Sequence, residues 1–140
     1  RNLWFHTGDA GVRDANGLIT FVDRIKDCIR RRGENISATE IEAVVGQLPG
    51  IHEVAAYAVP ADGAGAEDEV MLALVPSEGI TLDAADVASK ASALLPRFAK
   101  PRFLRLLDSL PKTATGKIQR AVLRQQGSAG AYDAESPSSR

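Results

Sequence analysis

The 140-residue sequence contains few of the residues from which several kinds of functional site are built. It has one cysteine, Cys28, and two histidines, His6 and His52, so it can form no internal disulfide and has no cluster with the spacing of metal ligands. Aromatic residues make up only 5%, which argues against base-stacking surfaces for nucleic acid. The formal net charge is −1, so a general attraction of the whole chain to nucleic acid or to anionic membranes is not indicated.

Long hydrophobic runs are also missing. The sequence has no apolar run of about 18 residues, and its first six residues lack the charged-then-apolar build of a signal peptide. We therefore expect no transmembrane segment and a cytoplasmic protein. The length fits one domain of ordinary size, or a small domain with a fragment of another. Because the chain does not begin with methionine, we expect it to be part of a longer protein.

Charged residues gather in one stretch, residues 23–42. Five cationic side chains and two carboxylates fall within residues 23–32, and Gly33 follows, where the backbone can turn at little cost. Ser37 and Glu40 then have the spacing of a capping box, which predicts that a helix begins here. A charged approach, a turn and a capped helix would hold a short basic segment in one direction, which suits an anionic ligand. The alternative is a solvated hairpin that precedes a helix.

The rest of the sequence alternates between helical and strand-like patterns. An Asn16-Gly17 turn predicts a hairpin, which has too few apolar residues to be stable alone and would therefore belong to a sheet upstream. The other expected elements are helices at 37–48, 83–95 and 118–127 and strands at 51–59, 69–75 and 102–107. This order predicts an α+β fold in which helices pack on a small mixed sheet, preceded by the hairpin. Residues 128–140 have little to bury, and we expect a disordered tail there.

Residues 111–117 form a second cationic segment between the last expected strand and the last expected helix. The segment looks like a phosphate loop, but a Walker A motif requires glycine in place of Pro111 and serine or threonine in place of Ile118. It offers instead a loop lysine, Lys117, directly after Gly116, which could reach an anion and later withdraw. The alternative is an exposed lysine without a specific role.

Four motifs follow one another along the chain: residues 4–9 (WFHTGD), 23–27 (DRIKD), 32–42 (RGENISATEIE) and 111–118 (PKTATGKI). Together they resemble the acyl-adenylate-forming superfamily of AMP-dependent synthetases and ligases. Within it, the segment 23–42 looks most similar to fatty acyl-CoA and crotonobetaine/carnitine-type CoA ligases. The resemblance covers only the C-terminal part of these enzymes. The sequence departs from the family at Asp23, where many members have glycine.

The resemblance implies the C-terminal lid domain of an ATP-dependent acyl-CoA synthetase. Such an enzyme converts a carboxylate and ATP to acyl-AMP and pyrophosphate, and then transfers the acyl group to the thiol of CoA. The implied division is the end of a large N-terminal adenylation domain at 1–25, a mobile C-terminal domain at 26–127 and the tail at 128–140. The chain alone would be inactive, because the N-terminal domain, its partner, would hold most of the ATP and carboxylic acid sites. Mg²⁺ would arrive with ATP, with its ligands outside this chain.

The resemblance also implies roles for individual residues. Lys117 corresponds to the catalytic lysine that bridges the substrate carboxylate and the α-phosphate during adenylation. Asp9 is expected to bind the ribose hydroxyls of ATP, Arg24 to lie beside the same nucleotide, and Lys26 to be the hinge of the small domain. The residues expected to line the tunnel for the pantetheine arm of CoA are Arg30, Arg32, Gly33 and Glu34. No metal site is expected.

Two other classes of function fit the same sequence. A peptide-synthetase-type adenylation domain would pass its acyl group to a carrier protein and not to CoA. A non-catalytic module that binds anions or proteins is the second alternative.

Overall fold

The structure, a computed structural model, describes residues 9–24, 28–61 and 67–136. In chain order its elements are β1 (Asp9–Arg13), β2 (Ile19–Arg24), β3 (Cys28–Arg31), β4 (Glu34–Ser37), α1 (Ala38–Val45), β5 (Ile51–Pro60), β6 (Asp68–Pro76), α2 (Ala84–Leu94), a short 3₁₀ helix η2 (Arg97–Ala99), β7 (Phe103–Leu106), α3 (Arg120–Gln126) and β8 (Tyr132–Asp133).

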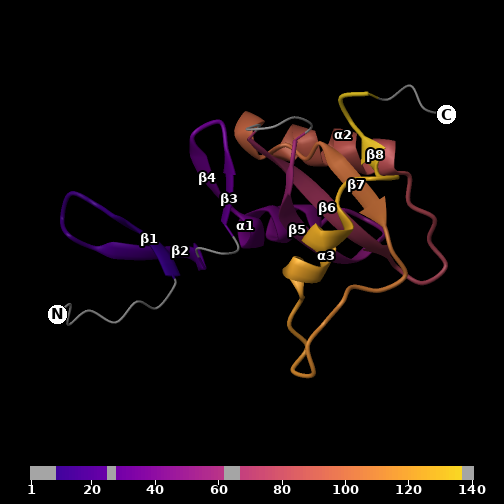
Figure 1. Ribbon diagram of the computed structural model, residues 1–140, viewed down its shortest axis with the longest axis horizontal. Coiled ribbons are helices and arrows are strands. Elements are labelled where there is room, and N and C mark those ends of the chain that lie inside the picture. The colour runs from indigo at the N-terminus through magenta and orange to yellow at the C-terminus, as the bar shows by residue number, and fades with distance from the viewer. Residues whose placement is uncertain (1–8, 25–27, 62–66, 137–140) are drawn as a thin grey trace.

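The strands form two hairpins and one larger sheet (Figure 1). β1 pairs with β2 and β3 pairs with β4, both antiparallel. The larger sheet has the strand order β5-β6-β7-β8, in which β6 and β7 are parallel and the other neighbours are antiparallel. The expected α+β fold, with a small mixed sheet and a preceding hairpin, is confirmed.

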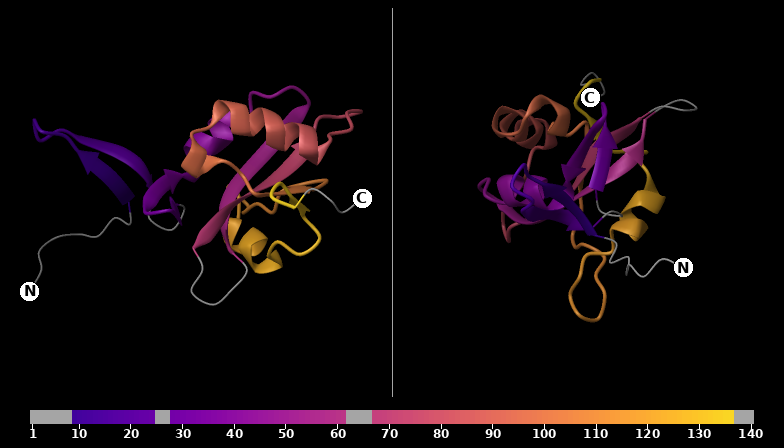
Figure 2. Two further views of the ribbon diagram at one scale, coloured as in Figure 1. Left: turned by 90° about the horizontal axis from the view of Figure 1, so that it is seen from above. Right: turned by 90° about the vertical axis from the view of Figure 1, so that its left-hand side faces the viewer.

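The central strand β6 is buried on both faces, because its side chains alternate between two hydrophobic clusters. Val70, Leu72 and Leu74 belong to one cluster, whereas Met71 and Ala73 belong to the other. This is why the strand is a nearly continuous apolar run in the sequence. Figure 2 shows the consequence: α2 and α3 lie on opposite faces of the sheet.

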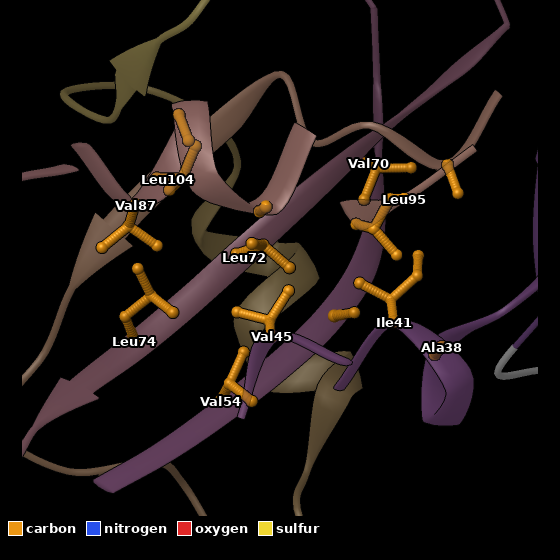
Figure 3. Close-up of a cluster of buried hydrophobic side chains, with 14 of the residues drawn as sticks. Ala38, Ile41, Val45, Val54, Val70, Leu72, Leu74, Val87, Leu95 and Leu104 are labelled. Atoms are coloured by element: carbon orange, nitrogen blue, oxygen red, sulfur yellow. The ribbon is translucent and has the colours of Figure 1, made fainter. Parts of the chain in front are cut away.

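The larger hydrophobic cluster joins α1 and α2 to the sheet. Figure 3 shows Ile41 and Val45 of α1 and Val87 of α2 directed toward Leu72 and its neighbours on the strands. Ile41 and Val45 are four residues apart and therefore lie on one face of the helix. The second cluster includes Leu123 of α3, which is fully buried.

The two longer helices begin where the sequence predicts. Ser37 is the N-cap of α1, and its Oγ accepts a hydrogen bond from the backbone N–H of Glu40 at 3.3 Å. Asp83 is the N-cap of α2, and its Oδ1 accepts from the backbone N–H of Ala85 at 3.0 Å. Each cap satisfies a backbone donor that a helix leaves unpaired at its first turn. α1 ends at Val45, three residues before the expected end.

The expectation of a disordered tail is wrong for residues 128–136. Strand β8 extends the sheet by pairing Tyr132 with Leu104 and Asp133 with Phe103, and the backbone N–H of Ala134 donates to the carbonyl of Arg102 at 2.8 Å. The composition of the tail indicates how little it can bury alone, but it does not reveal that β7 leaves an edge for another strand to occupy. Residues 137–140 lie outside the described residues.

Candidate functional site

The β3–β4 hairpin carries the first candidate site at its turn. Its strands are joined by two residues, Arg32 and Gly33, with φ angles of 52° and 76°. Two positive φ angles match the twist of the flanking strands, and glycine accepts this conformation without strain. Arg32 does not have that freedom, and a hydrogen bond from its backbone N–H to Glu67 Oε2 at 2.8 Å holds it in place. The turn is therefore a stiff tip.

Alternation along β3 and the turn decides which arginines are available to a ligand. Ile29 and Arg31 point into the body and are 1% and 4% exposed, whereas Arg30 and Arg32 are exposed. The sequence-based expectation for residues 30–34 does not distinguish the buried Arg31 from its exposed neighbours. The alternation of a β-strand could have predicted the burial of Arg31. Ile29 and Arg31 are two positions apart, so their side chains face the same side of the strand.

Arg31 anchors the hairpin to the main sheet. Its Nη1 donates to the backbone carbonyl of Lys100 at 2.7 Å, and its Nη2 lies 2.7 Å from Glu69 Oε2. Both side chains are largely buried, at 5% and 15% exposure. Removing one member of a buried pair leaves the other charge uncompensated, which typically costs about 3–5 kcal/mol. This contact fixes the hairpin relative to β6 and to the chain before β7.

A second pair, Arg102 and Asp133, joins the same network from β8. Arg102 donates to Asp133 through Nε at 3.2 Å and Nη2 at 3.3 Å. Burial alone would raise the pKa of the Asp133 carboxyl. The hydrogen bonds from Arg102 and from the backbone, together with the positive charge of Arg102, have the larger effect and hold this pKa below its ordinary value of 3.8. The carboxyl therefore stays ionised, and the tail remains clamped beside the hairpin at neutral pH.

A cleft opens between the hairpin, η2 and this network. Its lining includes Arg31, Arg32, Arg97, Lys100, Arg102 and Glu135. Arg31 and Arg102 are already paired with carboxylates, whereas Arg32, Arg97 and Lys100 are exposed. The exposed cations around one concave surface suit a polyanionic group such as a phosphate chain.

The second candidate site is the loop 111–119 that carries Lys117. A bridge between Lys112 and Ile118 closes the loop, and the backbone N–H of Thr113 donates to the carbonyl of Lys117 at 2.8 Å. Thr113 Oγ1 accepts from the N–H of Lys117 at 3.2 Å, and Gly116 has φ 83°, which only glycine adopts readily. Lys117 is exposed at the end of this narrow ribbon. The backbone of the lysine is thus held while its ammonium group is free to reach outward.

The structure brings some of the expected site residues together and separates others. Arg30, Arg32, Gly33 and Glu34 share one hairpin tip. The Lys117 loop projects from the opposite end of the body in two perpendicular views (Figures 1 and 2).

The residues expected at the nucleotide and at the hinge lie in the N-terminal part of the chain. Asp9 and Arg24 stand directly opposite each other in the register of the β1–β2 ladder. Lys26 lies outside the described residues, in the connection between β2 and β3.

Within the ranges 9–24, 28–61 and 67–136, no group of three or more His, Cys, Asp or Glu residues is arranged to hold a metal ion. Among the same residues, no helix has both the length and the apolar character needed to cross a membrane.

Comparison with protein families places the chain in a known group. The family model described as the AMP-binding enzyme C-terminal domain matches residues 40–117. A probable CoA ligase CCL9 of Humulus lupulus is 42% identical over 122 residues, covering 87% of this chain and 23% of the relative. An oxalate–CoA ligase of Arabidopsis thaliana is 40% identical over 122 residues, again covering 87% of this chain and 23% of the relative. The long-chain-fatty-acid–CoA ligase FadD13 of Mycobacterium tuberculosis is 35% identical, covering 91% of the chain and 25% of the relative.

Solved structures give the same result. The ATP-bound MatB of Rhodopseudomonas palustris superposes with a TM-score of 0.74 at 33% identity, covering 87% of this chain and 24% of that protein. A fatty acyl CoA synthetase of Mycobacterium tuberculosis superposes with a TM-score of 0.69 at 32% identity, covering 92% and 25%. The chain thus spans about a quarter of the length of the curated relatives it matches.

Proposed function

Because the chain belongs to the AMP-binding enzyme C-terminal domain family, we propose that it is the C-terminal domain of an ATP-dependent acyl-CoA synthetase. The enzyme activates a carboxylic acid as acyl-AMP with release of pyrophosphate, and then transfers the acyl group to the thiol of CoA. A carboxylate resists attack by a thiol because its leaving group would be oxide, so activation must come first. The cytoplasm, where ATP and CoA are available, is the compartment we propose.

The observation that carries this proposal is the exposed Lys117 on a hydrogen-bonded ribbon at the end of the matched family segment. Adenylation brings together two anions, the carboxylate and the α-phosphate of ATP. A lysine ammonium about 4 Å from the developing negative charge contributes roughly 4 kcal/mol at an effective dielectric constant of 20, before desolvation is subtracted. Lys117 is the residue we assign to this role.

ATP binding is assigned to the first hairpin. Asp9 takes the ribose hydroxyls, since a carboxylate has two acceptor oxygens for a vicinal diol, and Arg24 lies beside the nucleotide. Their directly opposite positions in the β1–β2 ladder support this joint role. Mg²⁺ enters with ATP, and its ligands belong to the N-terminal domain.

CoA binding is assigned to the β3–β4 tip and the adjacent cleft. Arg30, Arg32, Gly33 and Glu34 line the path of the pantetheine arm. The exposed cations of the cleft, Arg97 and Lys100 among them, have the charge that the phosphates of CoA require.

The two half-reactions use the two ends of the body in turn. Lys117 and the β3–β4 tip project in opposite directions, so both can reach one reaction centre only if the domain reorients between the steps (Figures 1 and 2). The hinge is Lys26, and residues 1–25 belong to the N-terminal domain. The mobile domain extends past residue 127, because β8 is part of its sheet.

The test is pyrophosphate exchange by the complete protein across a panel of carboxylic acids, followed by product analysis with CoA or a carrier protein as acceptor. We expect ATP-dependent exchange with at least one acid and formation of its CoA thioester. Transfer to a carrier protein alone would identify the peptide-synthetase class. Absence of exchange with every acid would leave the non-catalytic binding module.

A further inference from the structure

The outer edge of β5 is covered by two charged side chains from distant parts of the sequence. β5 is the end strand of the four-stranded sheet, so one side of its backbone has no partner strand among the residues that the structure describes. Glu42 Oε1 of α1 accepts from the backbone N–H of Ala56 at 2.9 Å. Arg120 Nε at the start of α3 approaches the carbonyl of Ala56 at 3.3 Å. The two side chains thus complete the hydrogen bonds of Ala56.

Glu42 and Arg120 also bind each other. Arg120 Nε lies 3.2 Å from Glu42 Oε1, and Nη2 donates to the same oxygen. The two side chains are only 15% and 16% exposed. A charge-assisted contact with two donors and little water around it is directional as well as strong. It locks the beginning of α3 onto β5 and α1.

The locked position is three residues from Lys117. Between them, Ile118 forms the bridge to Lys112, and the backbone N–H of Gln119 donates to the carbonyl of Pro111 at 2.8 Å. The other arm of the ribbon has its own attachment, because Lys112 Nζ forms an ion pair with Glu53 near the start of β5. Both arms of the ribbon are therefore held against one strand.

We propose that Glu42 and Arg120 are positioning residues that aim the Lys117 ribbon, with the exposed Lys112–Glu53 pair as a weaker second attachment. This inference rests on the proposed function. Neither Glu42 nor Arg120 touches a substrate in it. They act through Lys117. If the backbone at residue 120 shifts, the short hydrogen-bonded ribbon shifts with it, and the ammonium group of Lys117 is displaced. The pair therefore serves adenylation and not acyl transfer to CoA.

The test uses the complete enzyme with Glu42→Gln, Arg120→Gln and the double variant. Each is assayed for pyrophosphate exchange and, separately, for thioester formation from supplied acyl-adenylate and CoA. We expect kcat for adenylation to fall by at least about 10-fold, toward the roughly 100-fold that a misplacement of about 1 Å can cost. Thioester formation should stay within about twofold. KM for the acid should change little, because the interaction matters in the transition state. The double variant should lose little more than the worse single variant, because both substitutions remove the same ion pair.

Control variants separate positioning from general damage. Asp86→Asn removes an exposed ion pair with Lys90 on α2 and should leave both half-reactions unchanged. Lys112→Gln removes the exposed attachment without opening the core, and should lower adenylation in the same selective way but less. It provides a second measurement if the Glu42 and Arg120 variants fail to fold, as thermal unfolding would reveal.

The outcomes distinguish this inference from the proposed function. If the unmodified enzyme catalyses both half-reactions but the variants lose them equally, or lose neither, the positioning role is wrong. An Arg120→Gln effect that adds fully to Glu42→Gln also contradicts it. If the unmodified enzyme shows no pyrophosphate exchange with any acid, the proposed function itself has failed.

Discussion

Lys117 is an exposed residue whose backbone is held by hydrogen bonds, which restricts the directions in which its side chain can extend. Its side chain is in solvent, yet its N–H and carbonyl are both hydrogen-bonded to Thr113 across the ribbon. For the role in adenylation that we propose, a flexible loop would let the ammonium sample many positions, and each productive position would carry an entropic cost. A closed ribbon reduces that cost before the substrate binds.

We expect Lys117→Ala in the complete enzyme to lower adenylation by about 10²–10³-fold, the cost of losing one donor that stabilises a developing anion. Thioester formation from supplied acyl-adenylate should persist, since that step does not need this charge. Rapid-quench assays of the two half-reactions would measure both. Lys90→Ala, an exposed lysine on α2, is the matched control and should alter neither. Equal losses in both steps for Lys117→Ala would contradict the role.

Tyr57 is a residue whose burial has a measurable cost. It is 1% exposed, and its hydroxyl has no hydrogen-bond partner within the described part of the chain. Burial raises the pKa of Tyr57 to about 12, although the charge of Arg105 lowers it. Since a buried polar group without a partner is unfavourable, the ring contributes through packing alone.

Tyr57→Phe should therefore raise the free energy of unfolding of this chain by about 1 kcal/mol at neutral pH. Ionisation of Tyr57 makes the stability of the unmodified chain depend on pH, because the tyrosine ionises at lower pH in the unfolded state than in the folded state. No stability is lost on this account below the unfolded-state pKa of 10, and the loss grows as the pH rises toward about 12. The variant should lose less over this window. Urea unfolding between pH 7 and 11.5 measures both effects, and Tyr132→Phe serves as the half-buried control. A variant that is less stable at pH 7 would indicate a partner for the hydroxyl.

At the scale of elements, the β1–β2 hairpin and the starts of α1 and α2 were predictable, whereas the addition of β8 was not. The Asn16-Gly17 turn and the Ser37 cap are local, because their hydrogen bonds join residues at most four positions apart. The charged stretch 23–32 was harder to interpret. Among residues 28–32, Ile29 and Arg31 are buried. The partners of Arg31 are Glu69 and Lys100, far along the sequence. β8 depends in the same way on Arg102 and on the edge of β7.

The clamp on β8 predicts an acid-sensitive stability. Because the pKa of Asp133 is lowered in the folded state, its contribution is present above the ordinary value of 3.8 and is lost as the pH falls through the lower folded-state value. Asp133→Asn should destabilise the chain by about 1.5–3 kcal/mol at neutral pH, the range for hydrogen bonds to a charged group. The difference between the two proteins should shrink below about pH 4. Urea unfolding at pH 7, 4 and 3 measures it, with the exposed Asp108→Asn as control. A difference independent of pH would contradict the clamp.

At the scale of the whole molecule, the sheet separates two candidate tips. The β3–β4 tip is anchored through Arg31 to β6, whereas the Lys117 ribbon is anchored at the outer edge of β5 (Figure 1). Each tip thus has its own attachment, and one body presents both. The first hairpin, β1–β2, forms a separate sheet that is joined to this body through residues 25–27.

If these residues are the hinge, restricting them should unbalance the two half-reactions. Lys26→Pro fixes φ near −65° and should slow one half-reaction more than the other, because only one domain orientation suits that angle. Lys26→Ala removes the charge but leaves the torsion free, and should change the ratio less. Single-turnover rates for adenylation and for thioester formation in the complete enzyme give the ratio. An unchanged ratio and turnover for the proline variant would count against a hinge at this residue.

The order of the main helices and strands, the helix caps, the Asn16-Gly17 turn and the two cationic segments could all be predicted from the amino-acid pattern. These follow from local hydrogen bonds and from hydrophobic periodicity, which act over a few residues. Tertiary structure alone decided which arginine is buried, where the tail binds, and that Glu42 and Arg120, 78 positions apart, meet at Ala56. The last two outcomes depend on the edges of β7 and β5, and a strand has an edge only after the sheet has formed. The burial of Arg31 depends on Glu69 and Lys100, which the fold brings to it from far along the chain.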